Sequence, residues 1–204
     1  MSWQTLQADY PWPTARPEVT SFVHGWLVHK DAWGDLLGHL VRPIVLELGA
    51  WTGKTSGWLL DTFSGLRLVA CDLWAPSNQL SGRLAAWSED GTIPAGMTLR
   101  DLYVRNLWHR RDRCVMVQGQ SVECLRAVAE HLRPSVVYVD ADHSYRYAVA
   151  DIREAVRLFP RSVICGDDYA NGNTPSVSVN LAVHEVADEM GFSVVRRGRF
   201  WRYV

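Results

Sequence analysis

The sequence lacks the features that mark exported, membrane-bound and disulfide-stabilised proteins. It has four cysteines and no CxxC pair, and all four lie in apolar strand-like or helix-like segments. We therefore expect buried thiols in a reducing cytoplasm. No apolar run approaches the roughly 20 residues that span a bilayer. Residues 1–5 also lack the basic and then apolar layout of a signal peptide.

An excess of charge of one sign is missing as well. The 21 basic and 22 acidic residues leave a formal net charge of −1, so global electrostatics give no reason to expect nucleic acid as a partner. What is present is typical of a globular domain, with 48% hydrophobic and 21% charged residues. A chain of 204 residues is long enough for one domain with a full core.

From residue 44 onward, short apolar runs alternate with helical patterns. The expected strands are 44–48, 66–71, 114–117, 136–139, 163–165, 192–195 and 200–204. The expected helices are 52–63, 122–131, 145–159 and 174–190. Such alternation implies a parallel sheet with right-handed crossovers. We predict an α/β fold, a doubly wound Rossmann-like sheet of seven strands, mostly parallel with a C-terminal antiparallel hairpin.

Two segments fall outside this regular alternation. Residues 1–43 are expected to form an N-terminal helical cap segment, with helical pieces near 19–28 and 33–40, before a main domain of residues 44–204. An irregular, tryptophan-rich insertion is expected at about 73–106, because proline and glycine interrupt it. The tryptophans in or beside it either line a substrate pocket or pack the insertion itself; they are Trp74, Trp87 and Trp108.

Acidic residues follow two of the expected buried strands directly. Asp140, Asp142 and His143 follow the fourth strand, and Asp167 and Asp168 follow the fifth. Ligands bind at this edge of an open α/β sheet, and neighbouring strands lie only about 4.8 Å apart. The carboxylates could therefore converge on a hard divalent cation. The alternatives are a helix cap for Asp140 and a solvated turn for the Asp167–Asp168 pair.

The loop after the first strand contains two glycines. Gly53-Lys54-Thr55 looks like the end of a phosphate-binding loop, but only three residues separate Gly49 from Gly53 where that motif needs four. The dinucleotide fingerprint fails too, because Trp51 stands at its second glycine. What remains is an acidic residue, a glycine turn and a helix start, followed by Asp72 at the end of the second strand. A carboxylate there usually binds a ribose diol.

Both motifs carry a resemblance to a known family. Glu47-Leu48-Gly49-Ala50-Trp51-Thr52-Gly53 resembles the S-adenosylmethionine loop of class I methyltransferases, in the form found in metal-dependent O-methyltransferases such as catechol O-methyltransferase. Asp140-Ala141-Asp142-His143, with Asp167-Asp168, is similar to the metal motif of bacterial sugar and macrolide O-methyltransferases. It also resembles cephalosporin-hydroxylase-like proteins. The similarity covers about residues 44–204.

The resemblance implies two cofactors, S-adenosyl-L-methionine and Mg²⁺. It implies that magnesium is held by Asp140, Asp167 and Asp168, and that His143 is the general base, although some relatives place the base at the residue matching Asp142. The residues expected around the methyl donor are Glu47, Gly49, Ala50, Trp51, Thr52, Gly53, Asp72, Leu73, Gln120, Ser121 and Asp140. A helix cap by Ser121 explains that residue equally well.

The implied activity is methyl transfer to a hydroxyl of a small molecule, a sugar or phenol with a vicinal diol, in natural-product or glycan modification. The alternatives are a donor-binding relative with another reaction, a nucleotide-dependent phosphotransferase and a metal-binding interaction module. The expected partner is the small-molecule acceptor, with neither nucleic acid nor membrane; a homodimer is left open. The five histidines without acidic or cysteine partners at ligand spacing receive no role: His24, His29, His39, His131 and His184.

Overall fold

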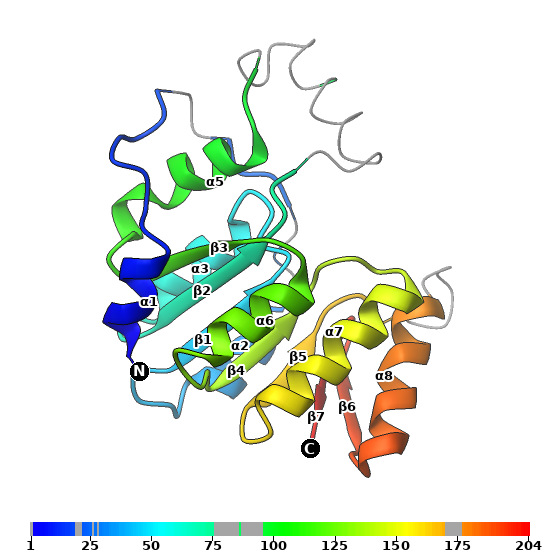
Figure 1. Cartoon of the computed structure of the whole chain (residues 1–204). Coiled ribbons are helices and arrows are strands. Elements are labelled where there is room, and N and C mark those ends of the chain that lie inside the picture. Colours follow the sequence, from blue (N-terminus) through cyan, green and yellow to red (C-terminus); the bar gives the residue numbers. More distant parts are fainter. Residues whose placement is uncertain are drawn as a thin grey trace.

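The computed structural model describes residues 2–18, 22–25, 27, 29–75, 86, 96–169 and 177–204. These residues form one seven-stranded sheet with the order β3-β2-β1-β4-β5-β7-β6 (Figure 1). The strands are β1 (Ile44–Leu48), β2 (Arg67–Asp72), β3 (Cys114–Gln118), β4 (Val136–Val139), β5 (Val163–Gly166), β6 (Val194–Arg197) and β7 (Phe200–Tyr203). Strands β1 to β5 are parallel, whereas β7 is antiparallel to both β5 and β6. The predicted fold class is confirmed.

Helices cover both faces of the sheet. They are α1 (Trp3–Asp9), α2 (Lys30–Leu37), α3 (Lys54–Thr62), α5 (Leu99–Leu107), α6 (Ser121–Ala129), α7 (Tyr145–Leu158) and α8 (Val177–Met190), with a 3₁₀ turn η1 (Trp108–Arg110). Successive side chains of a strand point to opposite faces. Leu46 and Leu48 accordingly pack with α1, α6, α7 and α8, while Val45 packs with α2, α3 and α5. Figure 1 shows the same two layers.

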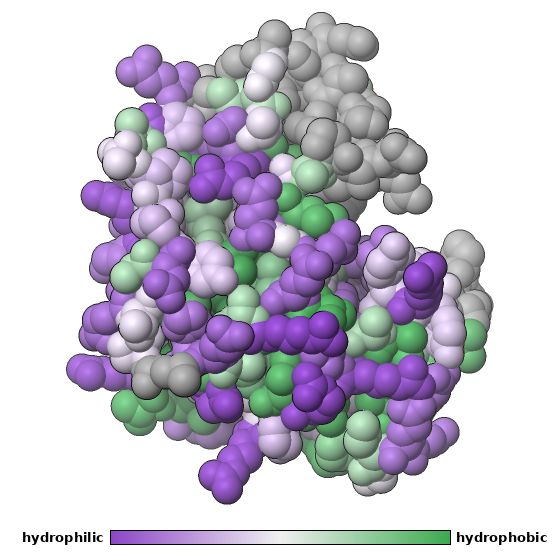
Figure 2. Space-filling model, in the orientation of Figure 1, coloured by the Kyte–Doolittle hydropathy of each residue, from purple (hydrophilic) through white to green (hydrophobic). Residues whose placement is uncertain are grey.

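The outer sides of the helices are largely polar. Figure 2 shows hydrophilic residues over much of the face formed by α6, α7 and α8, with hydrophobic residues between them. The helices are therefore amphipathic and turn their apolar sides to the sheet. Among the helices that the structure describes, none is long and apolar enough to cross a membrane.

The strand order of the sheet reverses direction between the paired strands β1 and β4. The chain leaves β1 through α3 towards β2 on one side, and β4 pairs with β1 on the other. This is the topological switch point, where ligands bind at the carboxyl ends of the strands. Gly49, just after β1, has φ +88°, and a Cβ there would lie 2.0 Å from the carbonyl oxygen of Asp140. Only glycine allows this approach, which brings the β1 loop against the end of β4.

The expected irregular insertion contains a helix that the sequence reading missed. Helix α5 begins with a capping box, in which the Thr98 side chain accepts from the Asp101 backbone and the Asp101 carboxylate accepts from the Thr98 backbone. Its buried side includes Tyr103, which packs against Trp74 with ring centroids 5.0 Å apart. Trp74 is thus a packing residue. Trp87 lies outside the described residues.

The N-terminal segment differs from the expectation in two places. Helix α1 was not expected; a capping box between Ser2 and Thr5 begins it, and Trp3 and Leu6 bury against the core. The helix expected near 19–28 is wrong for residues 22–25, which are not helical, while its residues 19–21, 26 and 28 lie outside the described residues. The Thr52 hydroxyl accepts from His24 N and donates to His24 O, so tertiary bonds take the backbone groups a helix would use.

The closing hairpin is present but shifted. Strand β6 begins two residues later than expected and includes Arg196 and Arg197, leaving only Gly198 and Arg199 as the turn. Gly198 has φ +63°, as a tight hairpin turn requires. An edge strand tolerates arginines because its outer side faces water. The expected start of α8 lies outside the described residues, and its expected stop is confirmed, with φ +73° at Gly191.

Candidate active site

Backbone conformations of the left-handed region gather at the carboxyl edge of the sheet. Among the described residues, four that are not glycine have positive φ, and three of them follow strands at this edge: Trp51 (51°), Trp74 (41°) and Asp168 (60°). Such conformations are energetically costly for residues with a Cβ and persist where the surroundings enforce them, which is often at functional sites.

The residues after β4 and β5 form a compact polar group. The Nε2 atom of His143 lies 2.7 Å from Oδ2 of Asp168 and 3.6 Å from Oδ1 of Asp140. Among the described residues, Asp140, His143 and Asp168 are the group whose potential ligand atoms all lie within 4.8 Å of one another. Two carboxylates and an imidazole at this spacing suit a divalent cation. The predicted metal residues Asp140 and Asp168 are therefore brought together.

Burial raises the pKa of the Asp140 carboxyl group. A hydrogen bond with His143 lowers that pKa, and the nearby charge of Asp167 raises it again. The carboxylates thus sit close enough to oppose one another's ionisation. A bound cation would relieve this repulsion, so the electrostatics of the group also fit a metal.

Asp167 lies beside this group but is directed elsewhere. Its Oδ1 atom is 2.8 Å from Nε2 of the buried His29, and it accepts a hydrogen bond of 2.6 Å from the backbone of Asp168. The Nε atom of Arg199 lies 3.3 Å from the same oxygen. Oδ1 of Asp167 thus has three partners, and Asp167 lies outside the group whose ligand atoms are all within 4.8 Å of one another.

His29 and Arg199 were missed by the sequence reading. His29 stands just before α2, 138 residues from Asp167 along the chain. Arg199 lies in the hairpin turn and bonds to Oδ1 of Asp168 through Nη2. No local sequence pattern predicts either contact, because both depend on the packing of distant segments against β5.

The neighbours Asp142 and His143 point in different directions. Asp142 accepts the backbone N–H of Ser144 through Oδ1 at 2.8 Å, which orders the turn into α7. His143, half-exposed, faces the two carboxylates instead. The side chain near the candidate metal group is therefore that of His143.

The loop after β1 is tied to the end of β2. The backbone N–H groups of Gly49 and Ala50 both point to the carbonyl oxygen of Cys71, at 2.8 and 3.3 Å. Asp72 accepts from the backbone of Trp51 through Oδ2 (2.8 Å) and from Trp74 through Oδ1 (2.7 Å). Burial raises the pKa of Asp72, and these backbone bonds counter the shift.

The remaining loop residues are held from the opposite side by the N-terminal segment. Trp51 donates its indole N–H to Nδ1 of His24 at 3.2 Å. Thr52, fully buried, binds the backbone of His24, and Gly53, the residue before α3, has φ +85°. Lys54 donates to the carbonyl oxygen of Gly25 at 2.6 Å. This lysine binds a backbone carbonyl of the protein itself, which agrees with the rejection of a phosphate-binding loop.

Glu47 lies behind the loop instead of facing it. Its side chain is fully buried and accepts a hydrogen bond from the hydroxyl of Ser56. The hydroxyl of Tyr103 continues this network by donating to Ser56 at 3.1 Å. Burial raises the pKa of Glu47 to about 8, although the Ser56 bond lowers it. Glu47 thus joins β1 to α3 and α5 through Ser56 and Tyr103.

Residues after β2 and β3 complete the edge. Leu73 is partly exposed, and its carbonyl oxygen accepts from the Gln118 amide at 2.9 Å. Gln120 precedes α6 and Ser121 is its first residue. Beneath them lies the buried Asp151 of α7, whose pKa burial raises to about 7 while a bond with Ser121 lowers it.

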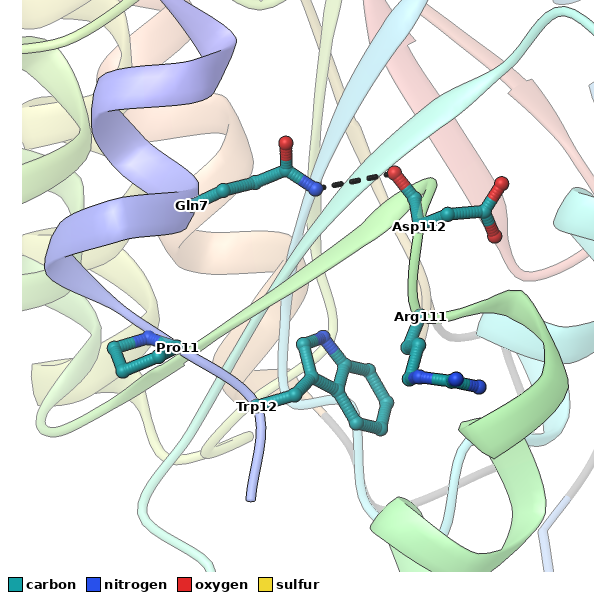
Figure 3. A pocket seen from close by; sticks show the side chains of 5 residues that line it. All are labelled: Gln7, Pro11, Trp12, Arg111 and Asp112. Atoms are coloured by element: carbon teal, nitrogen blue, oxygen red, sulfur yellow. Dashed lines mark hydrogen bonds between the residues drawn. The ribbon is translucent and has the colours of Figure 1, made fainter. Parts of the chain in front are cut away.

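A surface pocket lies away from this edge. It has a volume of about 460 Å³ and is lined by Gln7, Pro11, Trp12, Arg111 and Asp112 (Figure 3). Arg111 and Asp112 precede β3, so the hollow lies at the amino end of that strand. Trp12 there donates to the carbonyl oxygen of Cys114 at 2.7 Å, which covers the edge strand.

Comparison with known families identifies the class of protein. Residues 46–169 match the family described as "Methyltransferase domain". The match spans more than half of the chain, and the chain therefore belongs to this methyltransferase family. No curated protein sequence matches it significantly.

Solved structures share the fold at low sequence identity. Cofactor-bound Rv0187 from MTB is 19% identical, with a TM-score of 0.59, over 92% of this chain and 83% of that one. The O-methyltransferase from Bacillus cereus in complex with SAH is 18% identical, with a TM-score of 0.56, over 98% and 87%. CalS11, the TDP-rhamnose 3'-O-methyltransferase of calicheamicin biosynthesis, is 16% identical, with a TM-score of 0.53, over 85% and 75%.

Proposed function

We propose that this protein transfers a methyl group from S-adenosylmethionine to a hydroxyl of a small molecule, with Mg²⁺ bound beside the acceptor. The observation that carries the proposal is the contact between the β1 loop at Gly49 and the Asp140 end of β4. It puts the expected donor loop next to the group formed by Asp140, His143 and Asp168. The structures of similar fold include O-methyltransferases, one of them in complex with SAH.

The donor would be held by backbone groups of the β1 loop and by Asp72. Each oxygen of Asp72 already accepts one backbone N–H, from Trp51 or Trp74. An ionised carboxylate has about four acceptor positions, so both oxygens can accept a ribose hydroxyl in addition. The backbone bonds fix the orientation of the carboxylate before the donor arrives.

The cation would be held by Asp140 and Asp168, with Asp167 joining through Oδ2. When bound, it would lower the pKa of an acceptor hydroxyl and fix its position. His143 is the base of the proposal, because it is half-exposed and directed at the same two carboxylates. Asp168 orients the imidazole through the 2.7 Å contact with Nε2. Asp142 supports the turn by binding Ser144.

The acceptor is proposed to be a vicinal diol on a sugar or a phenol, because two neighbouring oxygens can bind one cation together. CalS11, a structure of similar fold, is a TDP-rhamnose 3'-O-methyltransferase, which supports a sugar among the acceptors to be tried.

The test compares methyl transfer with and without metal over a panel of glycosides and catechols. Turnover should disappear in EDTA and return with Mg²⁺ or Mn²⁺. Asp168→Asn should lose metal binding and turnover, whereas Asp188→Asn, the same charge change at an exposed position of α8, should keep both. Full turnover in a metal-free sample, with the metal content measured, would refute the metal role.

A further inference from the structure

Arg199 is fixed beside the carboxylates by the sheet itself. Its carbonyl oxygen accepts the backbone N–H of Tyr169 at 2.9 Å. In the same hairpin, the buried Trp201 donates its indole N–H to the carbonyl oxygen of Asp167 at 3.1 Å. The hairpin therefore places the Arg199 backbone next to the residues that follow β5.

The positively charged guanidinium group of Arg199 lies between the carboxylates of Asp167 and Asp168. Its Nη2 atom bonds to Oδ1 of Asp168, and its Nε atom lies 3.3 Å from Oδ1 of Asp167. Arginine does not lose its proton in proteins, so this positive charge is permanent. It partly offsets the repulsion among the carboxylates at this edge.

Both oxygens of Asp168 are engaged in this arrangement. Oδ1 binds Arg199, and Oδ2 contacts Nε2 of His143 at 2.7 Å. A divalent cation bound to Asp168 would have to share these oxygens with the two partners, and the positive charge of Arg199 would oppose it. The arginine side chain is 48% exposed, so its charged head can move into water while its stem stays in place.

We infer that Arg199 is a resident counter-ion, which positions Asp167 and Asp168 and competes with the divalent cation for them. The inference rests on the metal site of the proposed function. It makes Arg199 a positioning residue that weakens metal affinity, and not a ligand of the donor. Replacement of Arg199 by a neutral residue should then tighten metal binding.

The same hairpin supplies a matched control. Arg197 is 56% exposed and pairs with Asp35 at 2.8 Å and with Asp31 at 3.7 Å, both on α2. Arg199→Gln and Arg197→Gln change the net charge equally, within three residues of each other. Of these two arginines, only Arg199 contacts the carboxylates of Asp167 and Asp168.

The experiment is calorimetric titration of Mn²⁺ into the wild-type protein, Arg199→Gln, Arg197→Gln and Arg199→Lys, without donor or acceptor. Arg199→Gln should bind Mn²⁺ roughly three- to tenfold more tightly, the scale of a partly exposed charge pair. Arg197→Gln should match the wild type, and Arg199→Lys should lie near the wild type because it keeps the charge. Thermal unfolding checks that every variant is folded.

Each other result overturns the inference. If folded Arg199→Gln binds Mn²⁺ as tightly as the wild type, Arg199 has no effect on the metal site. If the variant binds more weakly, Arg199 supports metal binding instead of competing with it. If Arg197→Gln gains as much Mn²⁺ affinity as Arg199→Gln, the gain comes from the lower net charge of the protein and not from the position of Arg199. If the wild type and Arg199→Gln both fail to bind Mn²⁺, the metal role in the proposed function fails together with the inference. If the wild type binds Mn²⁺ and Arg199→Gln binds it equally well, the inference fails while the metal role in the proposed function stands.

Discussion

Replacement of Glu47 by glutamine should stabilise the protein at and above neutral pH. The glutamate is fully buried on β1, and burial raises its pKa from 4.5 to about 8. In the unfolded chain the group ionises near its ordinary value, so between these two pKa values the folded state holds a proton that the unfolded state has lost. The contribution to stability is therefore complete below about pH 4.5 and declines as the pH rises towards 8.

The size of the effect follows from the two pKa values. One pKa unit corresponds to about 1.36 kcal/mol. At pH 7, about 2.5 units above the unfolded pKa, the wild type has lost about 3 kcal/mol of the stability that it has in acid. Glutamine keeps an oxygen for the Ser56 hydroxyl and has no proton to lose. Between pH 5 and 8 the variant should gain about 3 to 4 kcal/mol relative to the wild type.

Urea unfolding of both proteins at pH 5, 6, 7 and 8 measures this difference. The comparison cancels the other titrating groups, including the buried Asp151, whose pKa is raised to about 7. A constant offset between the two curves would reflect the changed hydrogen bonding of glutamine. Parallel curves from pH 5 to 8 would refute the assignment of a buried, protonated Glu47.

Three further predictions concern the candidate active site. Asp72→Ala should weaken S-adenosylmethionine binding by tenfold or more, about 1.4 kcal/mol, in a folded protein; unchanged affinity in calorimetry would remove the ribose role. His143→Ala should lower kcat by roughly 10²- to 10⁴-fold, and Asp142→Asn by much less; the reverse order in steady-state kinetics would make Asp142 the base. Gly49→Ala should unfold at clearly lower temperature, because its Cβ would lie 2.0 Å from the Asp140 carbonyl oxygen; a wild-type melting curve would contradict the close approach.

The sequence predicts the sheet well because its strands are buried on both faces. β1 and β4 begin and end where the apolar runs do, at 44–48 and 136–139. The ends of such strands can be located in the sequence, because polar or turn residues flank the apolar run. The edge strand β6 has a weaker pattern, with three of its four residues exposed, and its expected position was two residues off.

Contacts between distant segments could not be predicted in this way. The segment 22–25 takes its form from Thr52 rather than from its own helix propensity. His29 reaches Asp167 across 138 residues, and Arg199 reaches Asp168 across 31. Their partners were visible as acidic residues after a strand, but which side chains meet these acids depends on tertiary packing.

The most direct measurement is transfer from S-adenosylmethionine with a trideuterated methyl group. The purified protein is incubated with this donor, Mg²⁺ and the glycoside and catechol panel, and the products are identified by mass spectrometry and NMR. The proposal predicts a product that carries one trideuteromethyl group on a hydroxyl oxygen, and none after EDTA treatment. Binding of the donor without transfer to any diol of the panel, or a label found on nitrogen or carbon, would contradict it.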